Sequence, residues 1–107
     1  MLERSGLPAP AAARYAEHMR QEGALRAALN WYRALPLGGR PVGRSRVPPT
    51  YVGGNRDVAL GRRAAEDTEQ YVRAPYRFVE LDAEHWLPEL APDDVADALV
   101  DRAATTG

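Results

Sequence analysis

Two side chains in the second half of the chain, Asp57 and His85, are of the types that transfer protons together. An imidazole accepts a proton near neutral pH, and a neighbouring carboxylate fixes its tautomer and stabilises its cation. Each residue also has a simpler interpretation. A lone histidine beside Trp86 can be structural, and an aspartate in a glycine-rich turn can hydrogen-bond to its own backbone. The catalytic interpretation of the two residues is favoured because each follows a run with the composition of a β-strand.

The elements around this pair predict a parallel crossover. Residues 50–53 and 76–81 have the aromatic and β-branched content of short strands, and residues 61–72 between them have helical periodicity. If the strands are parallel neighbours, Asp57 and His85 leave the same edge of one sheet. Ligands and catalytic groups collect at that edge in α/β folds.

A last helix is predicted to begin at Pro92, because a proline followed by two aspartates suits the first turn of a helix. Its apolar stripe consists of Val95, Ala98 and Leu99, and we expect these three side chains to be buried against the sheet.

The first part of the chain predicts helices instead of strands. Residues 9–20 are rich in alanine, Gly23 interrupts the pattern, and residues 24–35 place Leu25, Leu29 and Tyr32 on one stripe. The connection that follows, residues 37–46, holds three glycines, a proline and three arginines, which favours an exposed loop. The sequence therefore predicts a helical part, residues 1–36, a connecting loop, and an α/β part, residues 47–107.

Composition indicates an ordinary globular protein. The chain has 107 residues, of which 45% are hydrophobic and 27% are charged, and it has no cysteine for a disulfide or a thiolate metal site. The N-terminus has no apolar signal core, and no apolar run approaches membrane-spanning length. We expect a soluble, cytoplasmic protein with no membrane partner.

Charge is unevenly distributed along the chain. Residues 1–46 carry eight arginines and three glutamates, net +5, whereas residues 47–107 carry six arginines and twelve acids, net −6. The two predicted helices around Gly23 faintly resemble a DNA-binding helix-turn-helix. The acidic second half and a pI of about 6.1 count against that interpretation, so no nucleic-acid partner is predicted.

Two strands alone make an unusually small parallel sheet. Parallel sheets are generally larger and covered on both faces, so this one would expose an unpaired edge and apolar surface. The sequence therefore predicts the end of a larger α/β domain, or a homo-oligomer that covers the exposed edge.

Several motifs resemble the C-terminal part of the α/β-hydrolase fold, especially its epoxide-hydrolase-like members. In the second half these are VP at 47–48, YVGGNRD at 51–57, YRF at 76–78 and HWLPE at 85–89. Upstream, GAL at 23–25 and ALNWYR at 28–33 resemble the last helices of the cap domain of such enzymes. The resemblance implies a partial α/β-hydrolase fold, with two N-terminal cap-type helices followed by a parallel strand-helix-strand-helix unit.

The resemblance also implies roles for individual residues. Asp57 corresponds to the triad acid, His85 to the triad base, and Tyr32 to the cap tyrosine that donates a proton to the opening epoxide oxygen. Without the resemblance, Tyr32 would be assigned to helix packing. Trp31 and Trp86 are assigned to packing or to the substrate wall. The implied chemistry requires no metal and no organic cofactor.

The chain departs from the family in three ways. It has Gly53-Gly54 where members commonly have Trp-Gly, and two prolines where they usually have one. It also lacks a glycine-flanked Ser or Asp nucleophile elbow, since Ser5 and Ser45 are its only serines. Triad residues act as a unit, so we expect little turnover from this chain alone.

The sequence thus leaves several functions open. The first is an epoxide-hydrolase-like C-terminal fragment that acts on a small-molecule substrate once an N-terminal half supplies an Asp or Ser nucleophile. The chain could instead be an esterase or haloalkane dehalogenase relative, because the nucleophile decides between these classes. The last alternative is a non-catalytic, truncated module that self-associates.

Overall fold

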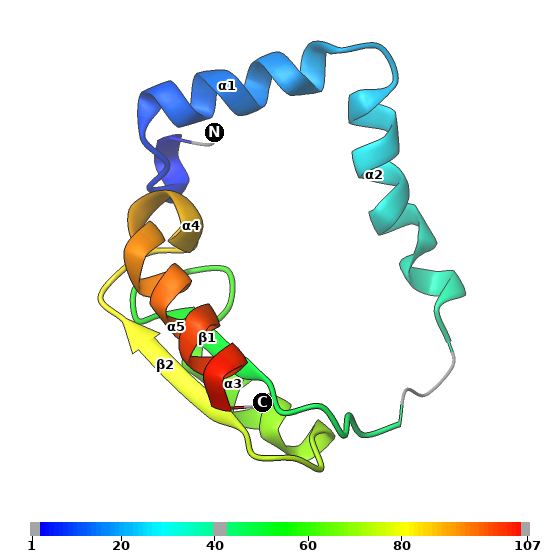
Figure 1. Cartoon of the computed structure of the whole chain (residues 1–107). Coiled ribbons are helices and arrows are strands. Elements are labelled where there is room, and N and C mark those ends of the chain that lie inside the picture. The colour runs from blue at the N-terminus through cyan, green and yellow to red at the C-terminus, as the bar shows by residue number, and fades with distance from the viewer. Residues whose placement is uncertain (1–2, 40–42, 106–107) are drawn as a thin grey trace. The chain divides into compact units, whose positions relative to one another are not determined.

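The computed structural model describes residues 3–39 and 43–105, and the chain forms two compact units. One unit is Pro8–Val42, and the other combines Met1–Leu7 with Gly43–Gly107. Figure 1 shows the helices and strands of each unit. Part of the predicted connecting loop, residues 40–42, lies outside the described residues. The assignment of the two parts to a cap and a hydrolase core stays a prediction.

The first unit is helical, as predicted. It contains α1, Ala9–Arg20, then α2, Ala24–Ala34, and a 3-10 turn at Leu35–Leu37. Gly23 separates the two helices with a φ of 81°, a left-handed conformation that glycine adopts without steric cost. The α2 helix has no buried residue, so its apolar stripe is exposed in this chain.

The second unit has the predicted strand-helix-strand order. After a 3-10 turn at Glu3–Ser5, its elements are β1, Thr50–Gly54, α3, Arg62–Thr68, a 3-10 turn at Glu69–Tyr71, β2, Arg77–Leu81, α4, Leu87–Leu90, and α5, Pro92–Thr105. The strands pair in parallel, with Thr50 opposite Arg77 and Gly54 opposite Leu81. Both predicted strands are thus confirmed, whereas the short α4 was not predicted.

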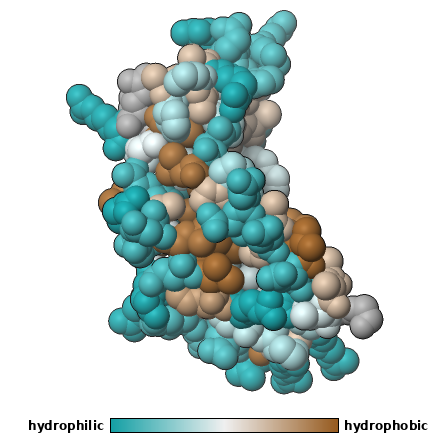
Figure 2. All heavy atoms as spheres, turned by 60° about the vertical axis from the view of Figure 1, so that its left-hand side comes forward, coloured by the Kyte–Doolittle hydropathy of each residue, from teal (hydrophilic) through white to brown (hydrophobic). Residues whose placement is uncertain are grey.

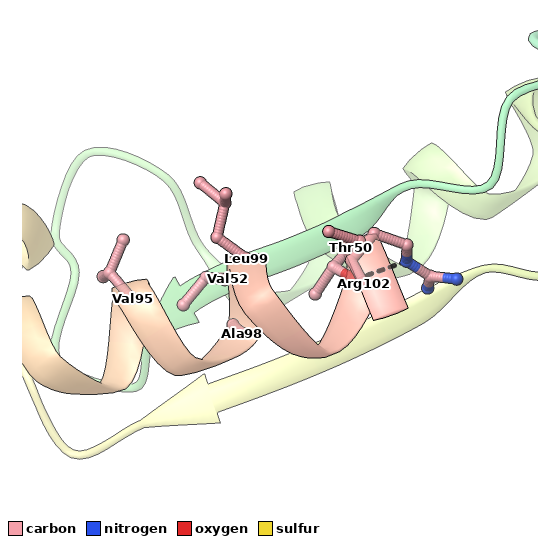
Figure 3. Close-up of a pocket in the computed structure, with 7 residues that line it drawn as sticks. Thr50, Val52, Val95, Ala98, Leu99 and Arg102 are labelled. Atoms are coloured by element: carbon pink, nitrogen blue, oxygen red, sulfur yellow. Dashed lines mark hydrogen bonds between the residues drawn. The ribbon is translucent and has the colours of Figure 1, made fainter. Parts of the chain in front are cut away.

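The two longer helices of this unit pack on opposite faces of the sheet. Tyr51 and Phe78 are register partners with ring centroids 5.9 Å apart, and the Arg62 guanidinium of α3 lies 5.7 Å from the Phe78 centroid. Side chains alternate along a strand, so Thr50 points to the other face. There the Nε of Arg102 on α5 donates to its Oγ1 at 2.9 Å (Figure 3).

The core of this unit is small, and one expectation about it is wrong. Ala98 of α5 is buried, but Leu99, predicted to lie on the same buried stripe, is 68% exposed. With only two strands, the sheet is too narrow to cover the whole stripe. A hollow of about 330 Å³ remains between β1 and α5, lined by Thr50, Val52, Val95, Ala98, Leu99, Arg102 and Ala103 (Figure 3). Hydrophobic atoms also reach the surface on the face seen in Figure 2.

Candidate active site

The structure brings Asp57 and His85 into direct contact. The Nδ1 atom of His85 lies 3.0 Å from the Oδ2 atom of Asp57. Asp57 lies in the turn after β1 and His85 in the loop after β2, so the contact depends on the parallel pairing of the strands. An ionised carboxylate only accepts hydrogen bonds, and Nδ1 is therefore the donor when Asp57 is charged.

The carboxylate of Asp57 is fixed at both oxygens. Its Oδ1 accepts the backbone N–H of Ala59 at 2.8 Å and that of Leu60 at 2.9 Å, which leaves Oδ2 for His85. The side chain is only 6% exposed. The backbone-bonding role expected for an aspartate in such a turn and the contact with histidine therefore coexist in one side chain.

The environment of Asp57 favours its ionised form. Burial raises the pKa of this carboxyl, but the hydrogen bonds from Leu60, His85 and Ala59, with the nearby imidazole charge, outweigh burial and hold the pKa below its ordinary value. The group is therefore a carboxylate at neutral pH, as required of a residue that orients and stabilises an imidazolium.

The imidazole of His85 presents its other nitrogen away from the aspartate. The side chain is 38% exposed, and Nε2 has no hydrogen-bond partner within residues 3–39 and 43–105. The Trp86 ring lies edge-on to the imidazole, with centroids 5.7 Å apart and an interplanar angle of 83°. An imidazole anchored through Nδ1 with Nε2 unpaired can accept a proton from water.

Backbone hydrogen bonds hold the two loops together beyond the strand ends. Asn55 N donates to Leu81 O at 2.9 Å, and Arg56 N donates to Ala83 O at 3.1 Å. Gly54 is required for this approach, because a Cβ there would lie 2.2 Å from the carbonyl oxygen of Ala83. The glycine is needed for space and not for an unusual angle, since its φ is not positive.

A charged pair that the sequence reasoning missed also links the loops. The Nη1 of Arg56 bonds to the Oδ1 of Asp82, and its Nη2 donates to the Asp82 carbonyl at 3.0 Å. Hydrogen bonds from Arg56 and Asn55 lower the pKa of the Asp82 carboxyl. The sequence could have indicated this pair, because Arg56 precedes Asp57, Asp82 lies shortly before His85, and parallel strands bring the two loops together.

The other predicted site residues fall in different places. Trp86 is part-buried beside His85, and its Nε1 donates to the Oγ of Ser5 at 2.7 Å. Tyr32 and Trp31 lie on α2 of the helical unit, where they are 72% and 81% exposed. Both side chains are thus largely uncovered in this chain, and the roles proposed for Tyr32 in catalysis and for Trp31 in packing or the substrate wall stay predictions.

The described part of the chain has neither a metal-binding cluster nor a membrane-spanning helix. Residues 3–39 and 43–105 contain no group of three or more histidine, aspartate or glutamate side chains arranged to hold a metal ion. Within the same residues, no helix has the length and apolar character needed to cross a membrane.

Sequence comparisons agree with an α/β-hydrolase assignment. The chain is 37% identical over 81 residues to the AB hydrolase superfamily protein YfhM of Bacillus subtilis (strain 168), a match that covers 74% of this chain and 28% of that protein. It is 38% identical over 78 residues to epoxide hydrolase 3 of Xenopus tropicalis, covering 70% of this chain and 21% of that protein. The chain is therefore a relative of the α/β hydrolases, and it is epoxide-hydrolase-like in sequence.

The matches also set the extent of the similarity. The chain spans less than a third of the length of these curated relatives. No family model matches it, and no solved structure does. The activity, substrate and partners of the whole relatives therefore come to this chain only as proposals.

Proposed function

We propose that this chain contributes the acid and the base of an epoxide-hydrolase-like catalytic triad and that its nucleophile lies on another polypeptide segment. The observation that carries the proposal is the 3.0 Å contact between His85 Nδ1 and Asp57 Oδ2. Two backbone N–H groups hold the remaining oxygen of Asp57, and the side chain is 6% exposed. The pair is thus built before any substrate binds.

The proposed chemistry combines this pair with a tyrosine and a nucleophile whose roles rest on the family resemblance. A carboxylate nucleophile on the other segment attacks an epoxide carbon, and the carbon–oxygen bond of the ring breaks to give an ester. Tyr32 donates a proton to the departing oxygen. His85 Nε2 then takes a proton from water while the water oxygen bonds to the ester carbonyl carbon. Asp57 stabilises the imidazolium, which returns its proton to the alcohol oxygen as the acyl–oxygen bond breaks. The other proton of the water remains on the released carboxyl group, and its transfer through solvent to the Tyr32 phenolate restores both groups.

The proposed partner segment has a structural place to bind. Among the described residues β1 pairs only with β2, so its other edge is free to receive a further strand. The hollow beside that edge is lined largely by apolar side chains of β1 and α5. In this proposal α1 and α2 are cap helices, the sheet unit is the end of a hydrolase core, and the missing strands pair with β1.

The test is complementation in trans. The purified chain is mixed with the part of the related epoxide hydrolase that lies outside the matched stretch, and hydrolysis of styrene oxide to the diol is measured. We expect no turnover from either piece alone and turnover from the mixture. His85→Gln should abolish that turnover, whereas His18→Gln should not, because His18 is exposed on α1 and assigned no role.

Two results would reject the proposal. One is a mixture that forms a complex, seen by light scattering, but does not hydrolyse the epoxide. The other is turnover that survives His85→Gln. Complement pieces with an Asp or a Ser nucleophile, assayed also with a chloroalkane and a p-nitrophenyl ester, distinguish epoxide hydrolase from dehalogenase and esterase chemistry.

A second candidate function, a self-associating module without catalysis, is favoured by the exposed apolar surface on α5. Leu99 is 68% exposed and lines the hollow beside β1, and Val100 next to it in sequence is 64% exposed. A homodimer that covers this surface should dissociate when Leu99 is replaced by arginine. Light scattering that finds a monomer for the unaltered chain would remove this alternative.

A further inference from the structure

We propose that residues 5–7, which we name the strap, position His85 by holding the loop on both sides of it. The strap precedes the first long helix and is far from His85 in sequence. The contacts of the strap with the residues around His85 are sufficient to infer that it positions the imidazole. Any effect of this positioning on catalysis rests on the proposed function.

The first contact is a hydrogen bond to Trp86, the residue after His85. The Ser5 hydroxyl oxygen accepts the indole Nε1–H at 2.7 Å in a part-buried setting. An indole has a single donor, so this bond anchors the N–H edge of the ring. The same ring lies edge-on to the His85 imidazole, with centroids 5.7 Å apart. Ser5 therefore determines where the surface that restrains the imidazole lies.

The second contact is with Glu84, the residue before His85. Gly6 has a φ of 86°, and a Cβ there would lie 1.4 Å from Oε2 of Glu84 and 2.5 Å from its carboxyl carbon. The backbone of the strap thus passes directly against this side chain, and its left-handed φ favours glycine at this position. The strap consequently contacts both neighbours of His85.

The third observation is that the strap is itself anchored. Leu7 is 2% exposed, which makes it the most buried leucine among the described residues. A buried leucine gives the strap an anchor in addition to its contacts with Glu84 and Trp86.

These contacts divide the control of the imidazole between two groups. Asp57 holds the Nδ1 edge of the ring, and Trp86 limits the rotation that remains around that contact. Ser5 acts through Trp86 and is a positioning residue. Its removal should leave the hydrogen bond to Asp57 available but allow His85 to adopt more than one orientation.

The test uses nuclear magnetic resonance on the full 107-residue chain in a Trp31→Phe background, which leaves Trp86 as the single indole. Two signals are followed: solvent exchange of the Trp86 indole N–H, and the nuclear Overhauser contact between the Trp86 and His85 rings. The test variant is Ser5→Ala, and Ser5→Thr retains the hydroxyl. Ser45→Ala is the matched control, since the other serine bonds to the backbone of Val47.

We expect Ser5→Ala to speed indole exchange roughly fivefold, the factor that one net hydrogen bond of about average strength supplies. The contact between the two rings should be lost. Ser5→Thr should restore both signals, and Ser45→Ala should change neither. Unchanged exchange and an unchanged ring contact in Ser5→Ala would overturn the proposal. If Ser5→Ala does not fold, Trp86→Phe breaks the same bond from the other side, and a phenyl ring that keeps the contact with His85 in that variant would overturn it.

The outcome is separable from that of the proposed function. The two signals need no substrate and no complementing segment, so a chain that fails the hydrolysis test can still show the effect of the strap. Loss of the ring contact in Ser5→Ala together with failed complementation would leave the positioning role intact and reject the hydrolase role alone.

Discussion

Replacing Asp57 with asparagine separates the two structural roles of this side chain. Asparagine has nearly the same shape, and its carbonyl oxygen can still accept the N–H groups of Ala59 and Leu60. Its NH₂ group replaces the oxygen that faces His85 and can only donate. The imidazole must then accept at Nδ1 and carry its proton on Nε2, so the nitrogen proposed as the base is no longer able to act.

The expected loss of stability follows from the hydrogen bonds. Asp57→Ala removes the acceptor of three hydrogen bonds, at distances of 2.8, 2.9 and 3.0 Å. Ala59 and Leu60 are exposed, so water can satisfy their freed N–H groups in part. We therefore expect a loss of about 1–3 kcal/mol in the free energy of unfolding, and about 1 kcal/mol or less for Asp57→Asn, which retains two of the three bonds.

The pH dependence has a definite sign. The folded chain holds the pKa of Asp57 below its ordinary value of 3.8. The stabilisation by the charged form is therefore complete above the unfolded pKa and is lost as the pH falls through the lowered folded value. The stability difference between the unaltered chain and Asp57→Asn should shrink as the pH falls below about 4.

Urea unfolding at several pH values measures these differences, and nitrogen chemical shifts of His85 report its tautomer. Asp101→Asn, at an exposed position on α5, is the control and should change neither. In the complemented enzyme, Asp57→Asn should reduce turnover by about 10⁴-fold, as the corresponding substitution does in a serine-protease triad. An Asp57→Asn chain that is as unstable as Asp57→Ala, or a stability difference that grows as the pH falls below about 4, would refute the reasoning.

Three further predictions concern the contacts that hold the loops and the sheet. Gly54→Ala should destabilise the chain by about 1–3 kcal/mol, because its Cβ would meet a rigid backbone oxygen at 2.2 Å. Gly53→Ala should cost less when both are measured by thermal unfolding, because its Cβ would meet the rings of Phe78 and Tyr51 at 3.2 and 3.4 Å. A double-mutant cycle with Arg56→Ala and Asp82→Ala should give a small coupling that weakens with added salt, because both side chains are exposed. A coupling insensitive to salt would contradict this. Arg102→Ala removes two hydrogen bonds to the start of β1 and should cost about 1–3 kcal/mol in urea unfolding, and an unchanged midpoint would show that these bonds do not stabilise the sheet.

Most of the secondary structure could be predicted from local sequence patterns. Helical periodicity placed α1 and α2 within a residue or two of their observed bounds, and strand composition placed β1 and β2 equally well. Local signals suffice for these elements because side-chain periodicity and backbone preferences act over a few residues. The spacing of Asp57 and His85 after two strands also predicted that they would meet, since parallel strands end at one edge of a sheet.

The surroundings of that pair could not be predicted in the same way. Folding placed Ser5 against Trp86, required a glycine at position 54 for the carbonyl of Ala83, and left Leu99 exposed. None of these follows from local pattern, because each depends on which distant segment occupies the neighbouring space. A hydrophobic stripe in the sequence shows which side chains can be buried. The width of the sheet in the folded chain decides which of them are buried.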